Sequence, residues 1–354
     1  MVNDRTAKKA AIDRASAEAR KSMNKFDAEI IGTLTDIYEQ AAEDVQAQIE
    51  GCADADGTLR LDVLQDLLSQ IQGRLKQLEG ARNTLLEKGL VDAATLGVAP
   101  FSGTIPGSAA VADEAVRFVR NFVAEDGLQL SDRLWRLDRH ARDLIGRAVE
   151  SAVIQGHSAS KAAQDFLARG VPVPADIVAK LDMANAGKVS RIAGQALTKG
   201  EGNPYANALR VFRTEINRAH LEAYRAGAFQ DPEVIGTKFM LSPNHRVRDI
   251  CDMHASVNRY GLGPGVYPRG KSPLPAHPNT HSYEVVVYAD EISDADRAGK
   301  TDRIAWLREQ PAEVQEAVLG SRGKRALLAR GDLKESEINT PWKVLRKKHE
   351  LDTA

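Results

Sequence analysis

Apolar residues in the first part of the chain recur with a helical period. Over residues 3–50 they are spaced by three or four positions, which places them on one face of a single long helix. This first stripe comprises Phe26, Ile30, Leu34, Ile37 and Ala41. A second stripe follows a glycine-bounded break at 51–57 and comprises Leu61, Leu64, Leu67, Leu68, Ile71, Leu75 and Leu78. The two stripes predict an antiparallel hairpin arm over residues 1–100, held by core or coiled-coil packing.

The next hundred residues keep the helical pattern but are interrupted several times. Residues 97–109 contain two prolines and three glycines and predict a linker. Helices are expected beyond it at 110–124, 131–155 and 175–198. A turn at Gly156 is expected to separate the second of these from a short helix that follows it. Residues 101–203 therefore form the predicted helical middle region.

The pattern changes after a strongly amphipathic helix expected at 204–228. Residues 237–241 and 283–288 are rich in β-branched and aromatic side chains and predict two strands. The segment between them is dense in Gly, Pro and His, and loops of this length are usually functional or cross-linked. We expect a small α+β domain over 204–295 and a basic helical tail over 296–354. The predicted fold class is mainly α, with a short antiparallel sheet and its Gly/Pro/His-rich loop.

Composition and charge mainly exclude certain classes of function. The 354 residues are 43% hydrophobic and only 5% aromatic, and 48 basic residues against 49 acidic ones leave a formal charge of −1. A balanced chain has no global attraction to nucleic acid or to an anionic membrane surface. Two cysteines far apart favour a reducing compartment. The polar N-terminus and the lack of a long apolar run predict a soluble protein made in the cytoplasm, with no membrane contact.

Four of the eight histidines fall within one short segment that also contains a cysteine. The arrangement is Cys251-x2-His254, a long Gly/Pro loop, and then His277-x3-His281. One thiolate and three imidazoles are a plausible tetrahedral set for Zn²⁺, although the spacing is not that of a standard zinc finger. The alternative is that the histidines cap turns and bond loop carbonyls, while Cys251 is a small buried residue.

Three separate segments resemble one known family. Residues 213–220 read R-T-E-I-N-R-A-H, which resembles the R-T-E-x-N-R-A helix of the phage Mu F-type head-morphogenesis proteins. Residues 249–254 read D-I-C-D-M-H, which is similar to that family's D-x-C-x-x-C segment. Residues 275–279, P-A-H-P-N, resemble the approach to its closing H-P-x-C-R-C. The motif positions carried over are Arg213, Glu215, Asn217, Arg218, Asp249 and Pro278. Order and spacing agree over residues 205–290, and a weaker likeness extends through 306–331.

The resemblance implies a structural role and not an enzyme. It suggests a minor head protein of a tailed bacteriophage, located in the virion head near the portal. Such a protein acts in head assembly or DNA packaging, contacts the portal and other head proteins, and in some cases leaves with the DNA. It has no small-molecule substrate. The sequence departs from the family because His254 replaces the second cysteine and Thr280-His281-Ser282 replaces the closing C-R-C. His254 and His281 could still serve as zinc ligands, or this branch has lost the metal and kept the loop.

Two other functional classes stay open. One is a DNA-binding module without sequence preference that uses the Cys/His loop and the basic C-terminal tail. The other is an ADP-ribosyltransferase-like toxin, because an Arg and a Glu near a small sheet could form its site, although Arg213, Glu215 and Arg218 could equally brace the sheet. A Ser-Thr-Ser strand and a Glu-x-Glu turn, which that chemistry needs, are missing from the sequence, as are a phosphate-binding glycine loop and a G-x-S-x-G elbow.

The C-terminal tail is the other candidate site. Between residues 322 and 348 there are nine Lys or Arg residues against three acidic ones. Such a segment could contact packaged double-stranded DNA without reading its sequence, or it could be a solvated helix face. The candidate contacts are Arg322, Lys324, Arg325, Lys343, Arg346, Lys347 and Lys348.

Overall fold

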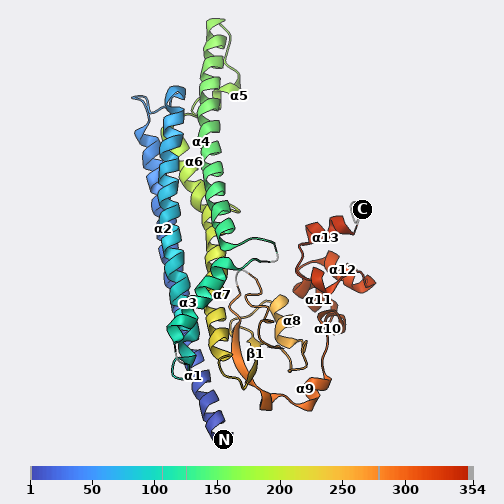
Figure 1. Ribbon diagram of the computed structural model, residues 1–354. Helices are drawn as coiled ribbons and strands as arrows, with labels where there is room; N and C mark the ends of the chain where they lie inside the picture. Colours follow the sequence, from blue (N-terminus) through green and yellow to red (C-terminus); the bar gives the residue numbers. More distant parts are fainter. Residues whose placement is uncertain (1, 106, 125, 278–279, 350–354) are drawn as a thin grey trace. The chain divides into compact units, whose positions relative to one another are not determined.

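The computed structural model describes residues 2–105, 107–124, 126–277 and 280–349 (Figure 1). Helices account for 68% of these residues, and the strands form one three-stranded antiparallel sheet. The predicted fold class, mainly α with a small α+β part, is confirmed. None of the described helices is long and apolar enough to cross a membrane.

The chain divides into two compact units, each assembled from separate stretches. One contains residues 24–90 and 119–215, and the other contains 1–23, 91–118 and 216–354. The four consecutive regions expected from the sequence cut across these units, and that division stays a prediction.

The unit of residues 24–90 and 119–215 is helical. Its elements are most of α1 (Val2–Gly51) and α2 (Leu64–Val98), the 3-10 helix η1 (Leu61–Val63), α4 (Leu130–Ala168), α5 (Ala175–Val178), α6 (Ala186–Thr198) and the start of α7 (Pro204–Ala228). The predicted stripes supply part of its core: Leu34, Leu67 and Ile71 are buried, whereas Leu61 is exposed. A buried ion pair between Arg82 and Asp138, at 2.7 Å, joins α2 to α4.

Two expectations for the helical region are wrong. The predicted turn at Gly156 lies inside α4, which continues to Ala168. Glycine is used there because a Cβ atom would stand 2.5 Å from the backbone nitrogen of Ala184, so the residue permits close packing and does not end the helix. The helix predicted at 175–198 is two helices, since Asn185 caps α6 by accepting a hydrogen bond from the backbone of Lys188.

The other unit contains the sheet, in the order β2-β1-β3. The strands are β1 (Val234–Met240), β2 (Val266–Tyr267) and β3 (Tyr283–Tyr288). Both predicted strands exist, and β3 has its predicted bounds. The two-residue β2 was not expected, because a strand this short has no periodic pattern. The helices η2 (Ala99–Phe101), α3 (Ser108–Asn121) and α8 (Ile250–Ser256) complete this part. Ile12, Phe101, Tyr224, Val286 and Tyr288 share one core cluster.

Two short helices, η3 (Ala289–Glu291) and α9 (Asp294–Ala298), follow the sheet. The residues after them fold into a small helical group against α8 (Figure 1). Its elements are α10 (Arg303–Glu309), α11 (Ala312–Leu319), α12 (Arg322–Arg330), η4 (Glu335–Glu337) and α13 (Trp342–Lys348). Met253 of α8 shares a buried cluster with Leu307, Leu327 and Leu345. The predicted tail is therefore helical, and it shares its core with α8.

Candidate functional site

The Cys/His segment is organised by the start of helix α8. Asp249 is the N-cap, and one of its carboxylate oxygens accepts from the backbone N–H of Cys251 at 2.7 Å. Asp252 accepts from the backbone N–H of Asp249 at 2.8 Å, which completes a capping box. His245 and His277 approach these two carboxylates, at 2.9 Å from Asp252 and 3.2 Å from Asp249. Both flanking loops are thereby tied to one helix end.

This arrangement brings together two overlapping sets of metal-ligating atoms. Asp249, Cys251 and His277 form one set, and His245, Asp249 and Asp252 form the other, with the ligand atoms of each set within 4.8 Å of one another. A carboxylate, a thiolate and an imidazole are all donors that Zn²⁺ accepts. The first set therefore fits the ion with three protein ligands, and it includes two of the four predicted ones.

The other two predicted ligands lie elsewhere. His254 is buried, its Nδ1 is 3.4 Å from the hydroxyl of Tyr267, and its ring lies near that of Phe239. Burial lowers the pKa of His254 to about 3, so the ring is neutral. His281 is exposed. Among the described residues, neither histidine belongs to a set of three ligand atoms, so a four-ligand site of Cys251, His254, His277 and His281 does not fit this geometry.

The surroundings of Cys251 favour the protonated thiol. Its sulfur lies 3.5 Å from the hydroxyl of Thr280, and burial raises the pKa of the thiol to about 11. A metal ion would have to displace that proton, because the thiolate is the ligand form. Binding at this site would therefore weaken as the pH falls.

Thr280 also connects the loop to helix α7. The side-chain amide of Asn217 donates to the backbone oxygen of Thr280 at 3.2 Å. Asn217 lies in the first motif segment, Cys251 in the second, and Thr280 follows the third. The first and second segments therefore both contact Thr280, and the third contacts the second through His277 and Asp249. Pro278 of the third segment lies outside the described residues.

The predicted bracing of the sheet by helix α7 uses a residue that the sequence analysis missed. Arg225 is buried and donates from Nε to Glu284 of β3 at 2.8 Å. It also donates to the backbone oxygen of Leu274 at 2.9 Å, and the second oxygen of Glu284 accepts from the Thr237 hydroxyl at 3.1 Å. The sequence feature that could have indicated this contact is Glu284, since a carboxylate inside a valine-rich strand needs a buried partner. Of the motif residues, Glu215 is buried and Arg213 and Arg218 are half-buried on α7.

The basic tail is divided between inward and outward side chains. Lys324 is buried and its ammonium donates to the backbone oxygen of Ile338 at 2.8 Å, which removes it from the candidate DNA contacts. Arg322 pairs with Glu316 at 2.9 Å and Lys348 with Glu337 at 2.6 Å. The outward face of α13 carries the exposed Lys343, Arg346 and Lys347, and Arg325 on α12 is half-buried.

Comparison of the chain with protein families, with characterised proteins and with solved structures finds no match in any of the three.

Proposed function

We propose that the chain is a minor head protein of a tailed bacteriophage, acting in head morphogenesis and DNA packaging near the portal. The supporting observation is that the three motif segments lie close together. Asn217 and Cys251 both contact Thr280, and His277 lies 3.2 Å from Asp249. Their proximity is consistent with a shared structural role for the three segments.

The polar groups beside the sheet support a structural role over catalysis. Arg225 and Glu284 satisfy each other inside the unit, and Glu284 has no exposed side-chain surface. A transferase would need such groups to face a substrate. We therefore propose no enzymatic activity, and the toxin alternative gains no support from this arrangement.

The test is mass spectrometry of purified heads and virions from the phage or prophage that encodes the chain. We expect a few copies per particle relative to the major capsid protein. Absence from both heads and virions would overturn the proposal. Asn217→Ala should lower incorporation because it removes the contact to Thr280. The matched control is Asn207→Ala, the same change on the same helix, where the amide bonds Gly202 instead.

We further propose that Zn²⁺ is held by Asp249, Cys251 and His277, and that it ties the loop to the start of α8. The loop also has an apolar core of its own, formed by Cys251, Tyr267 and Leu274 with Leu221 and Phe239, so the sequence-based idea that zinc replaces such a core is wrong. Metal analysis of purified protein should give about one zinc per chain. Cys251→Ser and His277→Gln should each remove it, whereas His281→Gln, at an exposed position outside the set, should not. Substoichiometric zinc in the unsubstituted protein would reject the site.

The exposed face of α13 supports a second candidate, binding of double-stranded DNA without sequence preference. Two phosphate contacts from Lys343 and Lys347 would give a logarithmic salt slope of roughly −2. Replacing both by alanine should abolish binding at low salt, whereas Lys21→Ala/Lys25→Ala, at two exposed lysines of α1, should leave it unchanged. No binding at low salt would dispose of this candidate.

A further inference from the structure

Four carboxylates gather at one end of the sheet because of the strand register. Val234 of β1 pairs with Tyr288 of β3, so the turn before β1 and the turn after β3 lie side by side. The first turn contains Asp231 and Glu233, and the second contains Asp290 and Glu291. Like charges this close repel one another unless cations compensate them.

The compensating cations all come from the first turns of helix α1. Arg5 contacts Glu233 at 2.5 Å and Asp290 at 3.0 Å. Lys8 pairs with Asp231 at 2.8 Å, and Lys9 pairs with Glu291. Ile12 follows on the same face and is buried in the core cluster of Phe101, Val234 and Tyr288. The anchors thus fall at positions i, i+3, i+4 and i+7, which is one face of a helix.

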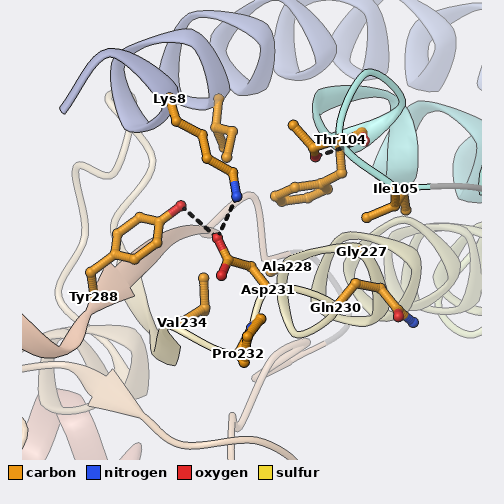
Figure 2. A pocket seen from close by; sticks show the side chains of 12 residues that line it. Lys8, Thr104, Ile105, Gly227, Ala228, Gln230, Asp231, Pro232, Val234 and Tyr288 are labelled. Carbon is orange, nitrogen blue, oxygen red and sulfur yellow. Dashed lines mark hydrogen bonds and ion pairs between the residues drawn. The ribbon is translucent and has the colours of Figure 1, made fainter. Parts of the chain in front are cut away.

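A cavity of about 130 Å³ lies beneath these contacts, lined by Lys8 and Ile12 of α1, by Phe101 and Ile105, and by Val234 and Tyr288 of the sheet. Figure 2 shows Lys8 reaching from α1 to Asp231, while the Tyr288 hydroxyl approaches the same oxygen at 3.5 Å. Burial and the neighbouring Asp231 raise the pKa of Tyr288 to about 12, so its hydroxyl donates to that carboxylate. Asp231 therefore accepts hydrogen bonds from Lys8 of α1 and from Tyr288 of β3.

We propose that the four carboxylates and the cavity form a docking site for a basic amphipathic helix, which the chain's own α1 occupies reversibly. The occupying face is largely ionic: Arg5 and Lys8 remain about a third exposed, and Ile12 is the buried apolar anchor. Contacts between partly exposed charges weaken as salt screens them. Rising ionic strength therefore releases residues 5–12 and opens the cavity. This site does not depend on the proposed head function.

Hydrogen–deuterium exchange on the full chain tests the release. Raising the salt from about 50 mM to about 500 mM should speed exchange of residues 5–12 about tenfold, because the Debye length shortens. The variant Arg5→Glu/Lys8→Glu/Lys9→Glu should exchange fast at both salts. The matched control Lys21→Glu/Lys25→Glu changes lysines that pair only within α1, and it should behave like the unsubstituted chain. The proposal would be overturned if the exchange rate of residues 5–12 changed neither with salt nor with the charge reversal.

Two further measurements keep the test decisive if the triple variant fails to fold. Lys9→Glu combined with Glu291→Lys should restore protection that Lys9→Glu alone removes. A labelled peptide of residues 2–23 should bind the full-length Lys9→Glu variant at low salt and dissociate as salt rises, and the same peptide with Ile12→Asn should not bind. Failure of the exchanged pair to restore protection, or of the peptide to bind an opened chain, would overturn the proposal.

Discussion

At the scale of single residues, a buried polar network links helix α7 to the sheet. Arg225 donates to Glu284, Glu222, Ser272 and the backbone oxygen of Leu274, and the second oxygen of Glu284 accepts from Thr237. The sequence shows that Glu284 interrupts an apolar strand, but it does not indicate which cationic side chain pairs with this carboxylate. Helix α7 carries several arginines, and only the packing angle of helix on sheet selects Arg225.

Removing one partner of this network should be strongly destabilising. Arg225→Ala leaves Glu284 buried without a cation, so we expect a loss of about 3–5 kcal/mol in the free energy of unfolding, measured by urea denaturation. Arg322→Ala, which breaks the exposed pair with Glu316, should cost less than about 1 kcal/mol. Similar losses for the two variants would show that the Arg225 pair is not desolvated as the structure describes.

Two buried histidines should make stability depend on pH. Burial lowers the pKa of His220 from 6.5 to about 4, and the ring bonds the backbone oxygen of Ala93 at 3.3 Å. Between these pKa values the unfolded chain binds the proton more readily. The contribution of His220 to the free energy of unfolding is therefore fully present above about pH 6.5 and is lost as the pH falls towards 4. His254, whose pKa is also lowered by burial, changes the free energy of unfolding in the same direction.

The measurement is the urea midpoint between pH 7 and pH 4.5. The His220 contribution lost over this range is on the order of 2–3 kcal/mol, and His220→Gln should flatten the profile by that amount. His281→Gln, at an exposed position, should leave the slope unchanged. An unaltered slope in the His220 variant would contradict the buried, neutral ring.

At the scale of elements, periodicity located the helices but not their ends. The apolar stripes of α1 and α2 are visible in the sequence, whereas the turn that the sequence predicts at Gly156 is absent. A glycine that breaks a helix and one that lets a neighbour approach look alike in sequence. The metal-ligand set shows the same limit. Spacing offered Cys251 with three histidines, but the capping box at the start of α8 turned Asp249 towards His277.

Helix α4 also contains Gly146, a glycine without a close neighbour, which provides a control for Gly156. A Cβ at Gly156 would stand 2.5 Å from the Ala184 nitrogen, whereas one at Gly146 would meet nothing within 4 Å. We expect Gly156→Ala to destabilise by about 1–3 kcal/mol through overpacking. Gly146→Ala should instead stabilise by about 0.5–1 kcal/mol, because alanine favours the helix. Thermal unfolding of both variants gives the comparison, and equal shifts would refute the close approach at Gly156.

At the scale of the whole molecule, the fold class can be predicted from the sequence, whereas the two compact units cannot. Local patterns indicate what each stretch forms, and only long-range contacts indicate which stretches share a core. Ile12 and Phe101 lie far along the chain from the sheet, yet they share its core with Tyr224, Val234 and Tyr288. Neither residue carries any sequence signal of that partnership, because an apolar residue on a helix fits any core equally well.

This composite core predicts that the α+β region does not fold alone. A fragment of residues 204–354 lacks Phe101, which belongs to the core whether or not residues 5–12 are docked, and it also lacks Gly97, whose missing side chain lets α2 approach the backbone of His220. Large apolar truncations in a core cost about 2–5 kcal/mol each, and the net stability of a domain is only about 5–15 kcal/mol. We expect the fragment to show collapsed NMR dispersion, and a co-expressed fragment of residues 1–118 to restore it. A well-dispersed spectrum from residues 204–354 alone would instead support four consecutive regions and would remove residues 1–23 and 91–118 from the core.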